Sequence, residues 1–167
     1  LTSAKDQSFR WRLIGFFADE SPLTVNNFVF LARDGFYDGV VFHRVIPGFM
    51  AQGSDPTGTG MGGSDKPDLK AEFSDIPFDR GVVGMARAQN PDSGNSQFFI
   101  MFKDGHFLNN QYTVVGRVTE GMDVIDAIKR GSTMVVTAVS QRDTQTQDTY
   151  SLSGTTNALN ALDTNCR

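Results

Sequence analysis

Hydrophobic and polar residues alternate over many short stretches of the chain, and this two-residue period predicts β-strands. β-Branched and aromatic residues fill these stretches, and Gly, Pro, Asn and Asp separate them. We expect strands at residues 9–17, 40–46, 81–86, 96–102, 112–118 and 133–139. Residues 53–70 are rich in Gly, Pro, Asp and Ser, which predicts a long surface loop.

Two other segments have the hydrophobic spacing of short amphipathic helices. Ser21 suits the N-cap and Pro22 the first helical position, which predicts a helix over residues 22–33. A second helix is expected over residues 122–129. Many short strands with two helices far apart in sequence favour an all-β fold, a closed barrel with helices over its ends.

Length and composition narrow the class of protein. A chain of 167 residues suits one folded domain, here expected over residues 1–140. The net charge of −4 and the lack of a basic cluster argue against nucleic acid as a partner. No apolar run approaches the roughly 20 residues of a membrane helix, so no membrane association is expected. The single cysteine is compatible with cytoplasm and periplasm alike.

The C-terminal residues 141–167 form a polar extension rich in Thr, Ser, Asn, Asp and Gln. Such a composition is typical of a solvated tail. The spacing of Ala158, Leu159, Ala161 and Leu162 also fits a short helix that docks on the domain or on a partner. We expect a monomer unless this extension docks on another protein.

Several other motifs are weak. Gly58, Gly60 and Gly63 have the spacing of a dinucleotide fingerprint, but neither a strand nor a helix flanks them. His43 and His106 are far apart, and one remote cysteine cannot complete a metal cluster of usual spacing with them. His43 is expected to be a hydrogen-bonded structural residue. A Ser-His-Asp hydrolase stays open on spacing alone, although no nucleophile-elbow sequence supports it.

Arg44 is the most informative charged residue because it lies in an otherwise apolar strand. One interpretation is an arginine whose stem lies on a sheet face and whose charge reaches solvent. The other is a fixed guanidinium beside an apolar pocket, with Phe49 and Met50 as its walls and Gln52 as a polar contact. The sequence around Arg44 leaves both open.

The strand at residues 96–102 favours the second interpretation. Phe98, Ile100 and Phe102 share one face and are expected to point into a core, while Gln97, Phe99 and Met101 share the other. A glutamine beside an exposed aromatic side chain suits a groove that binds apolar groups and hydrogen-bonds their backbone.

These segments together resemble the cyclophilin family, over roughly residues 9–140. The resemblance rests on Phe42–Met50 (FHRVIPGFM), Gln52–Gly53, Asp55–Gly60, Ser96–Ile100, Thr113–Val118, Gly121–Val124 and Pro22–Phe28. It implies a closed eight-stranded antiparallel barrel capped by two α-helices, with the active site on the outer face. It also implies a peptidyl-prolyl cis-trans isomerase that assists protein folding, acts on proline-containing polypeptides, and needs no cofactor or metal.

The resemblance assigns roles to particular residues. It implies Arg44 as the catalytic residue. It implies substrate-binding roles for Phe49, Met50, Gln52, Ala86, Arg87, Gln97, Phe99, Phe107, Leu108 and Tyr112.

Three of these positions depart from the best-known eukaryotic pattern and resemble bacterial cyclophilins. Arg87 replaces an asparagine whose contact is largely through the main chain, Phe107 replaces a tryptophan, and Tyr112 replaces a histidine. Because Phe107 lacks the indole N–H donor, we predict weak cyclosporin binding with catalysis retained. Two alternatives remain: a module that binds proline motifs without turnover, and a structural subunit docked through residues 141–167.

Overall fold

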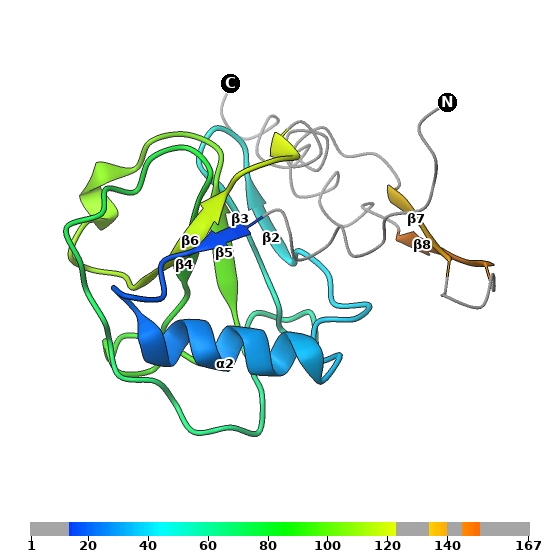
Figure 1. The fold of residues 1–167 in the computed structure, drawn as a ribbon, viewed down its shortest axis with the longest axis horizontal. Helices are drawn as coiled ribbons and strands as arrows, with labels where there is room; N and C mark the ends of the chain where they lie inside the picture. The colour runs from blue at the N-terminus through cyan, green and yellow to red at the C-terminus, as the bar shows by residue number, and fades with distance from the viewer. Residues whose placement is uncertain (1–13, 123–133, 140–144, 151–167) are drawn as a thin grey trace.

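The computed structural model describes residues 14–122, 134–139 and 145–150, and its centre is a six-stranded antiparallel sheet (Figure 1). The strands are β1 (Ile14–Phe16), β2 (Arg44–Ile46), β3 (Met50–Gly53), β4 (Val82–Met85), β5 (Phe98–Met101) and β6 (Val114–Val118). Their order across the sheet is β1-β6-β4-β5-β3-β2. This order places β3, β5 and β4 side by side, although more than 25 residues of chain separate β3 from β4.

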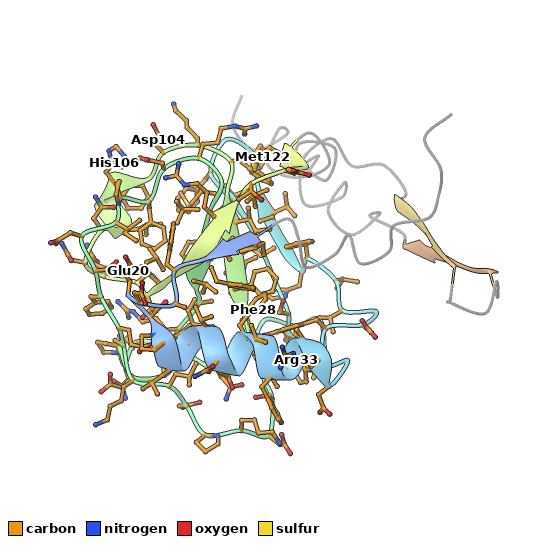
Figure 2. The ribbon with its side chains drawn as sticks, in the orientation of Figure 1. Glu20, Phe28, Arg33, Asp104, His106 and Met122 are labelled. Carbon is orange, nitrogen blue, oxygen red and sulfur yellow. The ribbon has the colours of Figure 1, made fainter. Side chains whose placement is uncertain are left out.

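Helix α2 (Pro22–Arg33) covers one face of this sheet, and it confirms the helix predicted over residues 22–33 (Figure 1). Phe28 projects from α2 towards the sheet (Figure 2) and is only 1% exposed. It belongs to a buried cluster with Val83, Ile100 and Val115. The helix therefore buries its apolar face against β4, β5 and β6.

The start of α2 differs in detail from the prediction. Ser21 is at the N-cap position, but its hydroxyl donates to the carbonyl oxygens of Phe17 and Val114 and does not cap the helix. The carboxylate of Glu72 accepts hydrogen bonds from the backbone N–H groups of Leu23 and Thr24 instead, at 3.1 and 2.9 Å. A distant residue thus satisfies the free amides of the first turn.

The opposite face of the sheet carries a second buried cluster. Its members are Met50, Phe78, Val82, Phe99, Met101, Leu108 and Val114. Leu108 comes from a short 3₁₀-helix, η1 (His106–Leu108), in the connection between β5 and β6. The predicted division of residues 98–101 between two faces is confirmed, because Phe98 and Ile100 pack on the α2 side and Phe99 and Met101 on the other.

The prediction of a closed eight-stranded barrel capped by two helices is wrong. The six-stranded sheet is open, with β1 and β2 at its edges. The expected closing strand, β7 (Met134–Val139), pairs with β8 (Gln145–Tyr150) in a separate two-stranded sheet. Alternation of hydrophobic residues fixes the two faces of a strand but not its neighbours, so the sequence pattern could not decide closure.

The predictions for the second helix and for the C-terminal segment have different outcomes. The described residues contain one α-helix, and the second helix expected at 122–129 lies outside them except for Met122. β8 lies within the segment expected to be a polar extension. The division of the chain at residue 140 stays a prediction. Within the described part of the chain, no helix combines the length and apolar character needed to cross a membrane.

Candidate active site

A chain of polar side chains runs across β2, β3 and β5 on the face away from α2. Antiparallel pairing sets Arg44 of β2 opposite Gln52 of β3. Arg44 Nη1 donates to Gln52 Oε1 over 3.4 Å, and Gln52 Nε2 donates to Gln97 Oε1 over 2.9 Å. Gln97 Nε2 donates in turn to the carbonyl oxygens of Gly60 and Gly62, at 3.0 and 2.8 Å. The exposed guanidinium of Arg44 is therefore connected to a backbone loop through two fixed amides.

That loop is organised by a buried carboxylate. Asp55 is 1% exposed and accepts hydrogen bonds from the backbone N–H groups of Thr57, Thr59, Gly60 and Gly62. Burial by itself raises the pKa of Asp55, but the hydrogen bonds from Thr57, Gly62 and Gly60 outweigh it and hold that pKa well below its usual range. Asp55 thereby fixes the two glycines whose carbonyl groups hold Gln97.

An apolar cluster lies on the same face of the sheet, and its member Phe99 pairs with Gln52, the contact of Arg44. Its deepest members are Met50, Phe99 and Leu108, which are 4%, 5% and 8% exposed. Phe49, Ala86 and Tyr112 are partly buried against them. Phe107 is 66% exposed and stacks on Phe49 with ring centroids 5.5 Å apart, which extends the apolar surface outward.

Phe99 lies deeper than the sequence suggested, and the expectation of an exposed aromatic side chain beside Gln97 is wrong. Its ring stacks on Phe78 at 5.7 Å and meets the edge of Tyr112 at 5.6 Å. Gly84 makes this stack possible, because a Cβ at that position would lie 2.6 Å from the Phe78 ring and collide with Phe99 as well. Phe99 is therefore a buried member of the cluster, held between Phe78 and Tyr112.

A groove of about 540 Å³ lies where β4 ends and β5 begins. Gln52, Ala86, Arg87 and Gln97 line it, together with the loop at residues 60–64. The backbone N–H of Ala86 is bonded to the carbonyl of Gln97 at 2.9 Å. Among the described residues, the backbone N–H and C=O of Arg87 have no partner, so they are free to bind an extended chain in the groove.

The expectation of a hydrogen-bonded His43 is wrong within the described part of the chain. Both ring nitrogens are buried, and neither has a hydrogen-bond partner there. Burial lowers the pKa of His43, the neighbouring Asp55 opposes that shift, and Arg44 adds to it. A neutral imidazole is therefore favoured beside the site.

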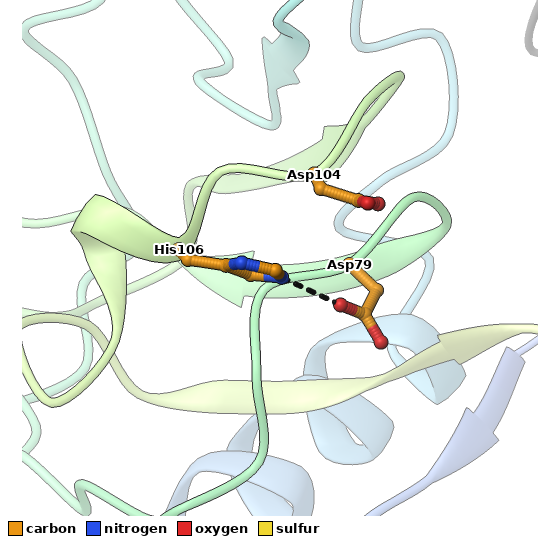
Figure 3. Close-up of side chains that lie close together, drawn as sticks. All are labelled: Asp79, Asp104 and His106. Carbon is orange, nitrogen blue, oxygen red and sulfur yellow. Dashed lines mark hydrogen bonds and ion pairs between the residues drawn. The ribbon is translucent and has the colours of Figure 1, made fainter.

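A cluster of charged and ionisable side chains lies around His106, the first residue of η1 (Figure 3). Asp79, Asp104 and His106 bring ligand-type atoms within 4.8 Å of one another. Asp79 accepts from His106 Nε2 at 2.8 Å and from Arg117 Nη2 at 3.2 Å, and these two bonds lower the pKa of Asp79. The guanidinium of Arg117 already pairs with this carboxylate, so we regard the cluster as an electrostatic link that holds η1 in place.

All the residues expected at the site lie together on this side of the sheet. The polar chain contains Arg44, Gln52 and Gln97, and the apolar cluster, its neighbours and the groove contain Phe49, Met50, Ala86, Arg87, Phe99, Phe107, Leu108 and Tyr112. Three contributors were not expected. Asp55 and Phe78 act beneath the surface, and the sequence marked Asp55 only as the first residue of the matching segment Asp55–Gly60. The carbonyl groups of the 60–62 segment leave no sequence signal at all.

Comparisons with known proteins point to one protein family. A family model described as cyclophilin type peptidyl-prolyl cis-trans isomerase matches residues 13–150. A probable peptidyl-prolyl cis-trans isomerase of Brucella abortus is 57% identical over 136 residues, which cover 75% of this chain and 69% of that protein. A peptidyl-prolyl cis-trans isomerase of Helicobacter pylori is 47% identical over 119 residues, which cover 69% of this chain and 72% of that protein.

A solved structure is similar in fold as well. The crystal structure of a cyclophilin type peptidyl-prolyl cis-trans isomerase of Cryptosporidium parvum, determined in the presence of the dipeptide Ala-Pro, has a TM-score of 0.68 and 32% sequence identity. The match covers 72% of this chain and 80% of that one. On the family match and these relatives, the chain belongs to the cyclophilin-type peptidyl-prolyl cis-trans isomerases and is an enzyme that interconverts the cis and trans forms of X-Pro peptide bonds.

Proposed function

We propose that Arg44 is the catalytic residue of this isomerase and that the apolar cluster near it forms the pocket that holds the proline ring. The observation that carries the proposal is the position of Arg44. Its guanidinium is exposed, and Gln52, which contacts it at 3.4 Å, pairs with Phe99 of the buried apolar cluster. An arginine of this kind keeps free donors for a bound peptide and loses little freedom on binding one.

The chemistry requires no covalent step. Rotation about an X-Pro bond must cross a barrier of about 18–20 kcal/mol, because the planar amide loses its conjugation. In the twisted state the proline nitrogen regains a lone pair. Arg44 would donate hydrogen bonds towards that nitrogen and towards the proline carbonyl oxygen. These bonds favour the twisted state over both planar states, which is the requirement for catalysis.

The apolar pocket supplies the second part of the proposal. Met50, Phe99 and Leu108 would contact the pyrrolidine ring, with Phe49, Phe107 and Tyr112 as the outer wall. The free backbone groups of Arg87, with Gln52 and Gln97, would bind the peptide backbone next to the proline. One side of the X-Pro bond is then held while the other side rotates.

Magnitudes show that Arg44 does not act alone. Each tenfold acceleration requires about 1.4 kcal/mol, so a 10⁵-fold effect requires roughly 7 kcal/mol. A charge-assisted hydrogen bond supplies about 1.5–3 kcal/mol. The remainder must come from the positioning of the proline in a largely dry pocket, which also strengthens the guanidinium interaction.

The direct test is turnover of an X-Pro tetrapeptide in a protease-coupled assay. Arg44→Ala should lower kcat/KM at least tenfold with an unchanged circular dichroism spectrum. Arg33→Ala is the matched control, since Arg33 is an exposed arginine at the end of α2, the helix on the opposite face of the sheet. Equal activity of the Arg44 and Arg33 variants would contradict the proposed role of Arg44.

We also propose a class of substrates and an oligomeric state for the enzyme. Proline-containing polypeptides, including chains that are still folding, are the proposed substrates, and the enzyme is a monomer unless residues 141–167 dock on a partner. Size-exclusion chromatography of the full chain and of a chain ending at Gln141 tests the second point. A larger particle that shrinks to monomer size only in the shortened chain would show that the extension mediates assembly.

A further inference from the structure

The side chain of Arg87 lies against the ring of Tyr112, and these are two of the three positions that depart from the eukaryotic pattern. We propose that Arg87 is a positioning residue that fixes Tyr112 as the wall of the proline pocket. The inference deepens the proposed function and rests on it, because it assumes that the proline ring binds against Tyr112. It assigns to the Arg87 side chain a role separate from that of its backbone.

Hydrogen bonds hold the guanidinium of Arg87 between two turns. Arg87 Nε donates to the carbonyl oxygen of Gln111 at 3.0 Å, in the segment that leads into β6. Arg87 Nη1 donates to the carbonyl oxygens of Ala88 and Gln89 at 3.0 and 3.2 Å, in the turn that follows β4. A planar group with several donors suits three carbonyl acceptors in fixed directions, whereas an ammonium group does not reproduce that geometry.

The same guanidinium covers the Tyr112 ring. The central carbon of the Arg87 guanidinium is 4.7 Å from the centroid of that ring, within the range of a cation–π contact. Tyr112 meets Phe99 at 5.6 Å with the two rings at 90°, and Phe99 stacks on Phe78. The order Arg87, Tyr112, Phe99, Phe78 therefore runs from the surface to the core, and Arg87 is its outer end.

Arg87 has a second route to the pocket through Gln111. Arg87 bonds to the carbonyl group of Gln111, and the side chain of Gln111 donates from Nε2 to the carbonyl oxygen of Phe107 at 2.8 Å. Phe107 belongs to η1 and stacks on Phe49. Loss of Arg87 should therefore loosen Tyr112 first and the η1 wall second.

A double-mutant cycle on Arg87 and Tyr112 tests the proposal. Arg87→Met keeps the aliphatic stem and removes the charge and the hydrogen bonds, and Tyr112→Leu removes the ring. In the native chain, we expect Arg87→Met to lower kcat/KM about three- to tenfold. In a Tyr112→Leu background, we expect the same substitution to lower kcat/KM less than twofold. Equal losses in both backgrounds would overturn the proposal, because Arg87 would then act without Tyr112.

A spectroscopic measurement separates positioning from general stability. The ring resonances of Tyr112, labelled with carbon-13, should shift and sharpen towards fast ring flipping in Arg87→Met, while the resonances of Tyr37 on the α2 side stay unchanged. Unchanged Tyr112 resonances would overturn the proposal even if activity fell. This readout does not depend on Arg44, so the proposal about Arg87 and the proposed catalytic role of Arg44 can fail separately.

Discussion

Gln52 donates a hydrogen bond of 2.9 Å from its Nε2 to the Oε1 of Gln97. This bond links β3, which pairs with the strand of Arg44, to the start of β5 beside the groove. The side-chain amides of Gln52 and Gln97 each accept through the oxygen and donate through the nitrogen. The donor-to-acceptor direction is therefore the same along the whole series of hydrogen bonds from Arg44 to Gln97. The carbonyl groups of Gly60 and Gly62 set that direction, because they accept only from an N–H group.

Replacement of Gln97 should therefore weaken catalysis through Arg44. Gln97→Ala removes the hydrogen-bond partner of Gln52. We expect the activation free energy to rise by about 1 kcal/mol, which is a roughly fivefold loss in kcat/KM. Gln97→Glu should cost more, because it turns a carboxylate oxygen towards the carbonyl groups of Gly60 and Gly62. Steady-state kinetics of the two variants measure the difference. An activity of Gln97→Glu above that of Gln97→Ala would refute the assigned direction.

Gly84 should be intolerant of any side chain. A Cβ at this position would meet Phe78 at 2.6 Å and Phe99 as well, so Gly84→Ala overpacks the stack of these two rings. We expect the free energy of unfolding to fall by about 1–3 kcal/mol and turnover to fall with it. Urea denaturation measures this change. The loss of unfolding free energy caused by Gly84→Ala should be smaller in a Phe78→Leu background, because the smaller side chain leaves space for the methyl group. A loss of the same size in that background would show that the added methyl group does not clash with Phe78.

Stability at acid pH should depend on Asp55. The pKa of Asp55 in the folded state lies below the ordinary value of 3.8. Its ionised form therefore stabilises the folded state fully at pH values well above 3.8. This stabilisation is lost as the pH falls through the lowered pKa. Asp55→Asn should melt at a lower temperature than the native chain at pH 7, and the difference should narrow towards pH 2. A difference that stays constant with pH would show that the charge of Asp55 is unimportant.

Cyclosporin should bind weakly because position 107 has no indole N–H. Phe107 is exposed and stacks on Phe49, so a larger ring can be accommodated there. Phe107→Trp restores one donor and should tighten inhibition about tenfold while leaving peptide turnover within twofold. Inhibition titrations of both proteins measure this change. Nanomolar inhibition of the native chain would contradict the prediction.

Local features of the fold could be predicted from the sequence, whereas its long-range features could not. The helix at 22–33 and the two faces of β5 follow from periodicity within one segment. Closure of the sheet depends on which strand pairs with which, and the pairing of β7 with β8 has no counterpart in the pattern of either segment. The capping of α2 by Glu72 depends in the same way on two distant segments.

The same distinction applies to the site. Arg44, Gln52 and Gln97 stand out in sequence because they are polar residues in apolar strands. The depth of Phe99 could not be predicted, because it depends on Phe78 and Gly84 in other segments. The contact of Arg87 with Tyr112 joins two residues that looked like independent substitutions.

The rate of rotation on the enzyme is the most direct test of the role of Arg44. Exchange NMR at saturating X-Pro peptide measures the interconversion of bound cis and trans forms separately from binding. For Arg44→Ala, with Arg33→Ala as control, we predict at least a tenfold slower interconversion and a peptide Kd changed by less than about threefold. An unchanged interconversion rate with a weakened Kd would contradict the account, because Arg44 would then bind the peptide without favouring its twisted state.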